Sequence, residues 1–146
     1  MRRKQMIWTI LYIGFMLFIF SNSLQNAADS SSRSGAVLKW LQEVFGSGWI
    51  TEHIVRKSAH FLEFMILGAI GLKCFGYYGF SVLPALFAGL LTAMTDETIQ
   101  RFVEGRSSQL TDVWLDFAGC VTGVFVIWLV RRLRGSRNAK ETTQEG

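Results

Sequence analysis

The chain has 146 residues, of which 50% are hydrophobic, and its formal net charge at pH 7 is +4. This length allows a single domain, and this composition excludes an ordinary soluble protein and favours a membrane protein. The excess of positive charge is better explained by membrane orientation and contact with anionic lipids than by nucleic acid, so we expect no nucleic-acid partner.

Four apolar segments are long enough to cross a bilayer, which takes about 20 helical residues. We expect them at residues 6–24, 54–75, 80–100 and 110–130. Backbone groups in lipid must be hydrogen-bonded within the protein, and these runs lack the alternation of barrel strands, so all four are predicted to be helices. The predicted fold is therefore all-α, with residues 1–146 forming one domain, a four-helix bundle in the membrane.

The basic amino end, Arg2 to Lys4, also permits a second interpretation of the first segment, as a cleavable signal peptide. Two observations favour a membrane span: the apolar run is long, and four helices make a more complete bundle than three. We therefore treat the first segment as a helix of the bundle.

Lysine and arginine are distributed unevenly between the two sides that four spans would create. One side has nine basic residues and two acids, namely Arg2, Arg3, Lys4, Lys73, Arg131, Arg132, Arg134, Arg137 and Lys140 with Glu141 and Glu145. The other side has six basic residues and nine acids. Because cytoplasmic loops are enriched in Lys and Arg, both termini are predicted to be cytoplasmic, with a basic tail at residues 131–146.

The first external loop divides into two parts. Residues 25–35 are rich in Ser, Asn, Asp and Ala, and we expect them to be a polar linker. Apolar residues then recur at helical spacing, namely Val37, Leu38, Trp40, Leu41, Val44 and Phe45. This pattern predicts a short amphipathic helix, which either docks on the bundle or lies on the outer membrane surface.

The last three predicted helices each carry polar side chains along one face, near the ends that share the external side. On the second and fourth helices these residues recur every three or four positions, which keeps them on one face: Lys57, His60 and Glu63, then Asp112 and Asp116. The third helix runs the opposite way and ends in Asp96, Glu97 and Gln100. Deeper in the third and fourth helices, small residues follow, namely Gly89, Ala93, Gly119 and Gly123. Because small residues permit close approach of helices, we expect the polar stripes to face one another and not the lipid.

Intramembrane charges indicate a functional site, because each one costs roughly 2.5 kcal/mol or more in hydrocarbon. Five acids, namely Glu63, Asp96, Glu97, Asp112 and Asp116, outnumber three bases, namely Lys57, Arg101 and Arg106, with His60 titratable. We expect a pocket that opens outward, with a basic rim for a phosphate or carboxylate and acids below it that could bind a cation or move a proton. The alternative is a network of buried salt bridges that only fixes the bundle.

Other candidate residues carry less information. Ser107 or Ser108 is expected to cap the fourth helix, and His53 is interpreted as an exposed loop histidine. Neither Cys74 nor Cys120 is placed for a disulfide, and no Cys/His zinc spacing occurs, so no metal motif is identified and the cofactor remains unknown.

Three blocks of sequence resemble the VanZ-like family: Arg56-Lys57-Ser58-Ala59-His60-Phe61-Leu62-Glu63-Phe64, Thr95-Asp96-Glu97-Thr98-Ile99-Gln100-Arg101-Phe102-Val103-Glu104-Gly105-Arg106-Ser107 and Asp112-Val113-Trp114-Leu115-Asp116-Phe117-Ala118-Gly119. The family pattern has Lys and His opening one helix, an acidic pair and Gln closing the next, a Gly-Arg turn, and an Asp beginning the last. This chain departs from it at Phe64, where Tyr is frequent, at Ile99, where some members have His, and at Glu104, where Pro is common. The resemblance implies a bacterial cell-envelope protein of the plasma membrane, whose founding members are associated with low-level resistance to teicoplanin-type glycopeptides.

Three functions then compete. In the first, Lys57 and Arg106 bind the headgroup of a membrane lipid, a lipid-linked cell-wall precursor or a lipoglycopeptide, and Glu63, Asp96, Gln100 and Asp116 complete that site. In the second, the protein is a membrane-embedded hydrolase or transferase acting on a lipid-linked precursor, with Glu97 or Asp112 as general base and His60 as acid. The third is a small proton-coupled or ion-coupled transporter, which would need to form a homo-oligomer.

Overall fold

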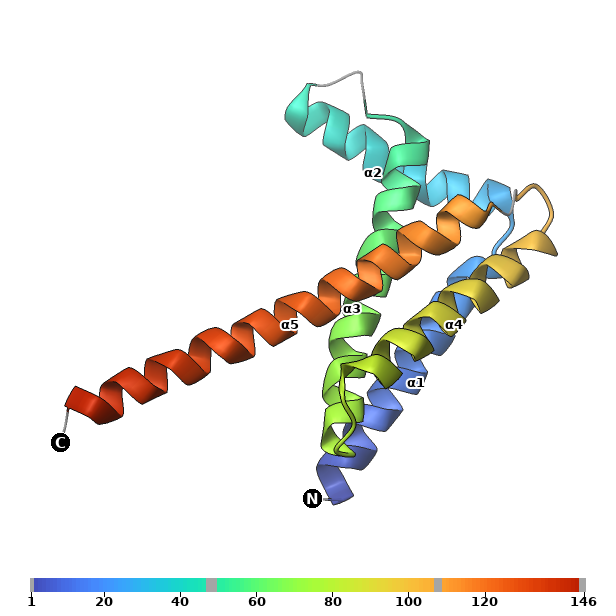
Figure 1. Cartoon of the computed structure of the whole chain (residues 1–146). Helices are drawn as coiled ribbons and strands as arrows, with labels where there is room; N and C mark the ends of the chain where they lie inside the picture. The colour runs from blue at the N-terminus through green and yellow to red at the C-terminus, as the bar shows by residue number, and fades with distance from the viewer. Residues whose placement is uncertain (1, 47–49, 107–108, 145–146) are drawn as a thin grey trace.

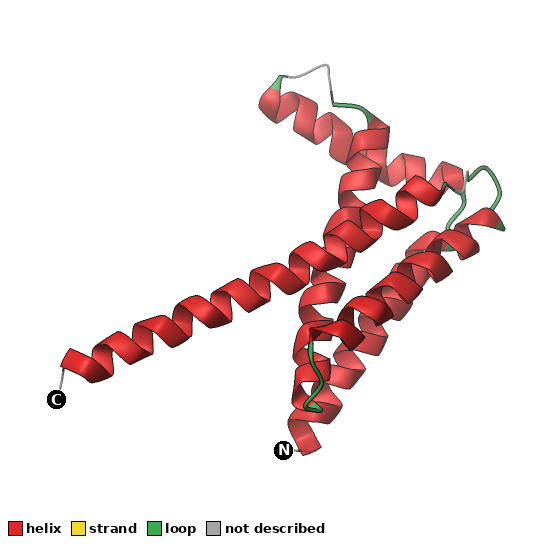
Figure 2. Cartoon of the chain, viewed as in Figure 1, coloured by secondary structure: helices red, strands yellow, loops and turns green. Residues whose placement is uncertain are grey.

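The computed structural model describes residues 2–46, 50–106 and 109–144. All regular secondary structure in these residues is helical (Figure 2). The helices are α1 (Arg2–Ser23), α2 (Ala27–Phe45), α3 (Glu52–Tyr77), α4 (Val82–Arg101) and α5 (Leu110–Gln144). The chain runs up α1, across α2, down α3, up α4 and down α5, so the amino ends of α3 and α5 meet the carboxyl end of α4 at one end of the bundle (Figure 1).

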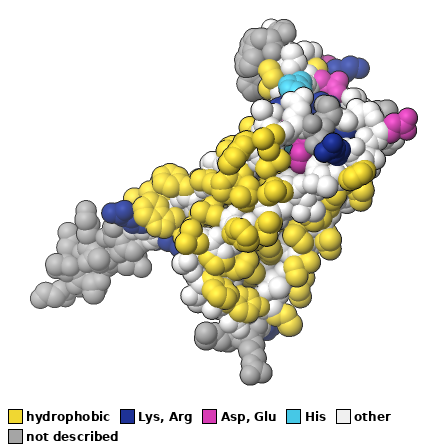
Figure 3. All heavy atoms as spheres, turned by 45° about the vertical axis from the view of Figure 1, so that its right-hand side comes forward, with side chains coloured by type: hydrophobic (Ala, Val, Ile, Leu, Met, Phe, Trp, Pro, Cys, Tyr) yellow, Lys and Arg dark blue, Asp and Glu magenta, His cyan; other side chains and the backbone are white. Residues whose placement is uncertain are grey.

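Four of these helices are long and apolar enough to cross a membrane, over Arg3–Ser23, Glu52–Tyr77, Val82–Arg101 and Leu110–Arg134. Their ends differ from the predicted spans by at most four residues. Hydrophobic side chains cover the middle of the molecule, and most of the charged side chains in view lie toward its ends (Figure 3). The prediction of an all-α membrane fold is confirmed, while the orientation of the helices across the membrane stays a prediction.

The helix between the first two spans is longer than expected. The prediction of a polar linker at residues 25–35 is wrong, because α2 already begins at Ala27. Ser34 Oγ donates a hydrogen bond to the Ser30 carbonyl oxygen (2.9 Å), one turn earlier, so this hydroxyl is satisfied within the helix. Among the described helices, α2 packs against α3 alone, and Trp40 remains 59% exposed.

Close packing of α5 on α3 is made possible by glycine. A Cβ atom on Gly119 would overlap the Phe61 carbonyl oxygen, and one on Gly123 would overlap the Met65 carbonyl oxygen. Gly89 on α4 leaves room in the same way for the sulfur of Cys120 on α5. The prediction that these small residues allow the polar faces of the helices to meet is therefore confirmed.

Short turns connect α3 to α4 and α4 to α5, and each contains a glycine with positive φ. Gly79 has φ +81° and Gly105 has φ +76°, conformations that other residues rarely adopt. In the second turn the Arg106 amide donates to the Val103 carbonyl oxygen (3.2 Å). Gly105 thus reverses the chain directly before Arg106, which lines the cavity described next.

Candidate functional site

A cavity of about 90 Å³ lies where the first turns of α3 and α5 meet the end of α4. It is lined by His53, Arg56, Lys57, His60, Glu97, Gln100, Gly105, Arg106, Gln109, Asp112, Leu115 and Asp116. Seven of the nine residues predicted for the site are in this lining, and the other two, Glu63 and Asp96, are tied to the carboxyl end of α1. Three helices and one turn therefore bring together residues that are far apart in the sequence.

Two carboxylates of the site are held by side chains at the carboxyl end of α1. Asp96 is fully buried, and its Oδ1 accepts a hydrogen bond from Ser23 Oγ (2.6 Å). Its Oδ2 accepts one from Gln100 Nε2 (2.8 Å), on the same helix. Glu63 Oε1 accepts a hydrogen bond from Asn22 Nδ2 (2.9 Å). Donors from α1 thus complete a site that otherwise belongs to α3, α4 and α5.

Three polar groups nearby lack such partners. Asp116 is only 2% exposed, lines the cavity, and accepts no hydrogen bond from any described residue. Glu97 Oε1 accepts a hydrogen bond from the Gln109 amide (2.5 Å), whereas its buried Oε2 has no partner among the described residues. The same holds for the buried Nδ1 of His60, which lies 4.0 Å from Asp96 Oδ2. A buried polar group without a partner costs free energy, so this convergence points to a ligand.

The rim of the cavity is basic. Lys57 Nζ forms an ion pair with Asp112 Oδ1. Arg56 and Arg106 also line the cavity, yet within the described ranges neither has a carboxylate oxygen within 4.0 Å. Burial lowers the pKa of the Arg106 guanidinium, and the positive charge of Arg56 acts in the same direction. The positive charge of Arg56 therefore destabilises that of Arg106, which an anion between the two guanidiniums would offset.

The sequence profile of the VanZ/LLP1 family matches residues 8–131. The chain belongs to this family. No curated protein and no solved structure matches it in the comparisons. The matched residues contain the whole cavity and all four candidate spans except their outermost ends, so this VanZ/LLP1 protein is a multi-pass membrane protein.

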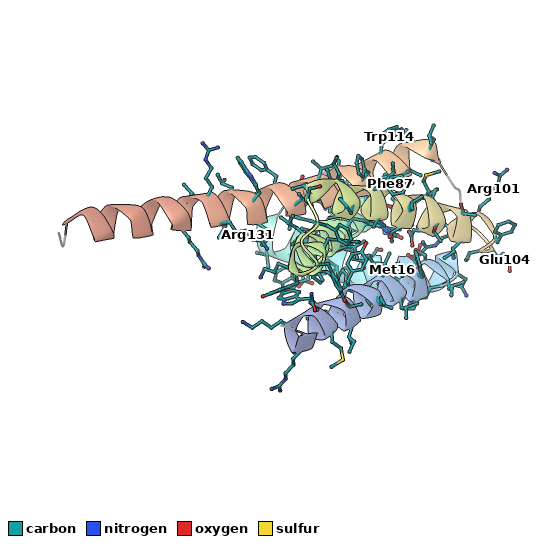
Figure 4. All side chains as sticks on the ribbon, turned by 60° about the horizontal axis from the view of Figure 1, so that its bottom comes forward. Met16, Phe87, Arg101, Glu104, Trp114 and Arg131 are labelled. Atoms are coloured by element: carbon teal, nitrogen blue, oxygen red, sulfur yellow. The ribbon has the colours of Figure 1, made fainter. Side chains whose placement is uncertain are left out.

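The structure corrects two sequence predictions for residues near this VanZ/LLP1 cavity, Arg101 and His53. Arg101 is exposed at the end of α4 and points away from the bundle, as does Glu104 (Figure 4), so Arg101 is not a rim residue. Arg56 lines the cavity and is the additional basic residue of its rim. His53 is not a loop residue, because α3 begins at Glu52 and the Thr51 side chain accepts a hydrogen bond from the Ile54 amide (3.4 Å). The proposed caps Ser107 and Ser108 lie outside the described residues.

A network of buried salt bridges, the alternative to a functional site, would require these acids and bases to pair. Within the described residues, two such contacts occur among the acids and bases of the site. Lys57 forms an ion pair with Asp112, and His60 Nδ1 lies 4.0 Å from Asp96 Oδ2. Glu63, Glu97 and Asp116 have no basic side chain within ion-pair distance in the described part of the chain. Within the described residues, the acids and bases of this VanZ/LLP1 site therefore do not form an extended network of salt bridges.

Proposed function

We propose that this VanZ/LLP1 protein binds an envelope lipid by an anionic, phosphate-bearing headgroup in the cavity, and that this binding contributes to resistance to teicoplanin-type glycopeptides. The observation that carries the proposal is that Arg56 and Arg106 line the cavity without a carboxylate partner among the described residues. Guanidinium groups bind phosphate oxygens in pairs, with two N–H donors each.

An apolar groove supports a lipid as the ligand. The groove lies between α3 and α5 and is lined by His53, Ile54, Lys57, Ser58, Phe61, Leu62 and Leu115. It shares His53, Lys57 and Leu115 with the polar cavity, so the two spaces adjoin. A ligand with a charged headgroup and an acyl or polyprenyl chain would fit both surfaces. Leu62 is 50% exposed, which leaves this groove open toward the surrounding lipid.

The predicted orientation puts the cavity at the external side of the membrane, because that side has six basic residues and the other side has nine. Lipid-linked cell-wall precursors are presented at this side, and teicoplanin-type drugs carry an acyl tail and act there. A protein that holds the precursor headgroup, or the drug itself, would reduce access of the drug to its target. Among envelope lipids we therefore favour a lipid-linked cell-wall precursor.

The test uses the purified full chain in detergent, with a polyprenyl diphosphate as probe and the uncharged polyprenol as its control ligand. Arg56→Gln and Arg106→Gln should each weaken diphosphate binding about 10-fold to 100-fold, since a hydrogen bond to a charged group contributes roughly 1.5–3 kcal/mol. Arg101→Gln is the matched control, because Arg101 is exposed and outside the cavity. Equal affinity in all three variants, or equal binding of diphosphate and alcohol, would reject headgroup binding.

The same variants test the link to resistance. In a susceptible Gram-positive host, the wild type and Arg101→Gln should protect against teicoplanin, whereas Arg56→Gln and Arg106→Gln should not at equal membrane abundance. Protection that survives loss of diphosphate binding would separate the resistance from this cavity.

A second candidate function, hydrolysis or transfer at the bound headgroup, is favoured by one observation. Among the described residues, Glu97 Oε2 and His60 Nδ1 are buried without hydrogen-bond partners beside the cavity, whereas Asp112 is paired with Lys57. Glu97 would then be the general base and His60 the acid. Glu97→Gln distinguishes this function, because it should abolish turnover of a lipid-linked precursor while leaving diphosphate binding in place.

A further inference from the structure

We infer that His60, Asp96 and Asp116 form a binding site for one divalent transition-metal ion, Zn²⁺ or Mn²⁺, beneath the basic rim. The three residues come from α3, α4 and α5, respectively. One ligand atom from each lies within 4.8 Å of the other two. The inference does not depend on headgroup binding, because it uses other residues of the same end of the bundle.

The geometry is close to that of a metal centre. Metal bonds of about 2.0–2.2 Å place neighbouring ligand atoms roughly 3.0–3.5 Å apart. Atoms within 4.8 Å of one another therefore have to approach by at most about 1.8 Å, a distance within reach of rotations of the imidazole and carboxylate side chains. The glycine contacts already hold α3 and α5, which carry His60 and Asp116, close together.

An unsatisfied buried carboxylate is the second, independent observation. Asp116 is only 2% exposed and lines the cavity, and it accepts no hydrogen bond from the described residues. His60 Nδ1 is buried and equally without a hydrogen-bond partner there. An unpaired carboxylate at this depth costs several kcal/mol, and a cation held between Asp116, His60 and Asp96 would remove that cost.

Asp96 has the surroundings expected of a metal ligand. Ser23 Oγ and Gln100 Nε2 each donate a hydrogen bond to one of its oxygens and fix the orientation of the carboxylate. Hydrogen bonds of this kind around a ligating carboxylate raise metal affinity and are part of most metal centres. Each carboxylate oxygen retains a lone pair for the ion.

The chemistry of the donor set selects the metal. One imidazole nitrogen with two carboxylates suits Zn²⁺ or Mn²⁺, whereas Ca²⁺ and Mg²⁺ prefer oxygen ligands alone. Three protein ligands leave at least one coordination position open. Since His60 and Asp116 line the cavity, water or a phosphate oxygen within it could fill that position.

The experiment measures metal in the purified full chain. The protein is stripped with a chelator in detergent, dialysed against Zn²⁺ or Mn²⁺, and desalted. Bound metal is then counted by inductively coupled plasma mass spectrometry. We expect about one ion per wild-type chain and a higher unfolding temperature with the ion than without it. Asp116→Asn and His60→Gln should bind at least tenfold less metal. Asp112→Asn is the matched control, since Asp112 is a carboxylate of the same cavity that already pairs with Lys57, and it should keep the ion.

A measurement on the wild type alone guards against misfolded variants. Co²⁺ added to the stripped protein should give visible d–d absorption bands. Their intensity should rise with the amount of Co²⁺ added, up to one equivalent per chain. Absence of these bands together with substoichiometric Zn²⁺ and Mn²⁺ would overturn the inference, as would equal metal content in Asp116→Asn and Asp112→Asn. Arg56→Gln should keep the metal while losing diphosphate binding, so failure of the metal site and failure of headgroup binding give different results.

Discussion

The contact between α3 and α5 at Gly119 controls the distance between His60 and Asp116, and a single methyl group should disturb it. In Gly119→Ala, the new Cβ would lie 3.2 Å from the Phe61 carbonyl carbon and 3.3 Å from the Met65 amide nitrogen, and it would overlap the Phe61 oxygen. All three are backbone atoms of α3 and cannot rotate away. Ordinary contact distances of about 3.5–4.0 Å are restored only if α5 moves away from α3 by roughly 1 Å.

The magnitude follows from two opposed effects. Overpacking costs about 1–3 kcal/mol, while replacing Gly by Ala inside a helix gains up to about 1 kcal/mol. Gly14 on α1 isolates the second effect, because a Cβ there meets nothing within 4 Å. We therefore expect Gly14→Ala to be neutral or slightly stabilising, and Gly119→Ala to be less stable than Gly14→Ala by about 1–3 kcal/mol.

Equilibrium unfolding of the purified protein in mixed micelles measures this difference. Gly71→Ala adds an intermediate case, since its Cβ would lie 3.1 Å from Tyr12 Cε2, an atom of a side chain that can shift. The expected order of stability is Gly14→Ala, then Gly71→Ala, then Gly119→Ala. Equal stability of Gly14→Ala and Gly119→Ala would show that α3 and α5 are not as close as the structure has them, and would remove the basis for a tightly spaced site.

Two further outcomes are expected. Ser23→Ala removes the hydroxyl that donates to the fully buried Asp96, and it should lower the free energy of unfolding by about 1–3 kcal/mol in the same assay. Ser21→Ala is the control, because the exposed Ser21 hydroxyl donates only within its own helix, and it should change the free energy of unfolding by no more than about 0.5 kcal/mol. For orientation, Lys39→Cys on α2 and Ser81→Cys in the α3–α4 turn are both exposed positions, and both native cysteines are buried. A membrane-impermeant maleimide should label only Lys39→Cys in intact cells, and labelling of Ser81→Cys alone would invert the proposed topology.

The four spans were predictable from sequence because membrane length and hydropathy determine them almost independently of packing. The facing of the polar stripes was also predictable, since a spacing of three or four residues fixes the face of a helix. The small residues Gly119 and Gly123 on the same stripe marked the side on which α5 meets α3. These features depend only on local periodicity, so one sequence contains the information.

Features that depend on turns and on partners from distant helices were not predictable in this way. Whether Arg101 or Arg56 joins the rim depends on the last turn of α4 and the first turn of α3, where one residue changes the direction of a side chain by about 100°. The hydrogen bonds from Asn22 and Ser23 require the depth at which α1 packs. The polar residues at the carboxyl end of α1, directly after its apolar middle, were the available signal. The grouping of His60, Asp96 and Asp116 combines single residues from three helices and matches no linear metal motif.

The distribution of unpaired charge is the strongest reason to regard this end of the bundle as a binding site. Arg56, Arg106, Glu97 and Asp116 line the same cavity, yet among the described residues none of them is within 4.0 Å of an opposite charge. Long arginine side chains would close such gaps if neutralisation were their only role, because uncompensated charge in a region of low dielectric is costly. Keeping the cations and the acids apart instead leaves two separate demands, an anion at the rim and a cation below it. A phosphate-bearing headgroup above a metal ion would meet both at once.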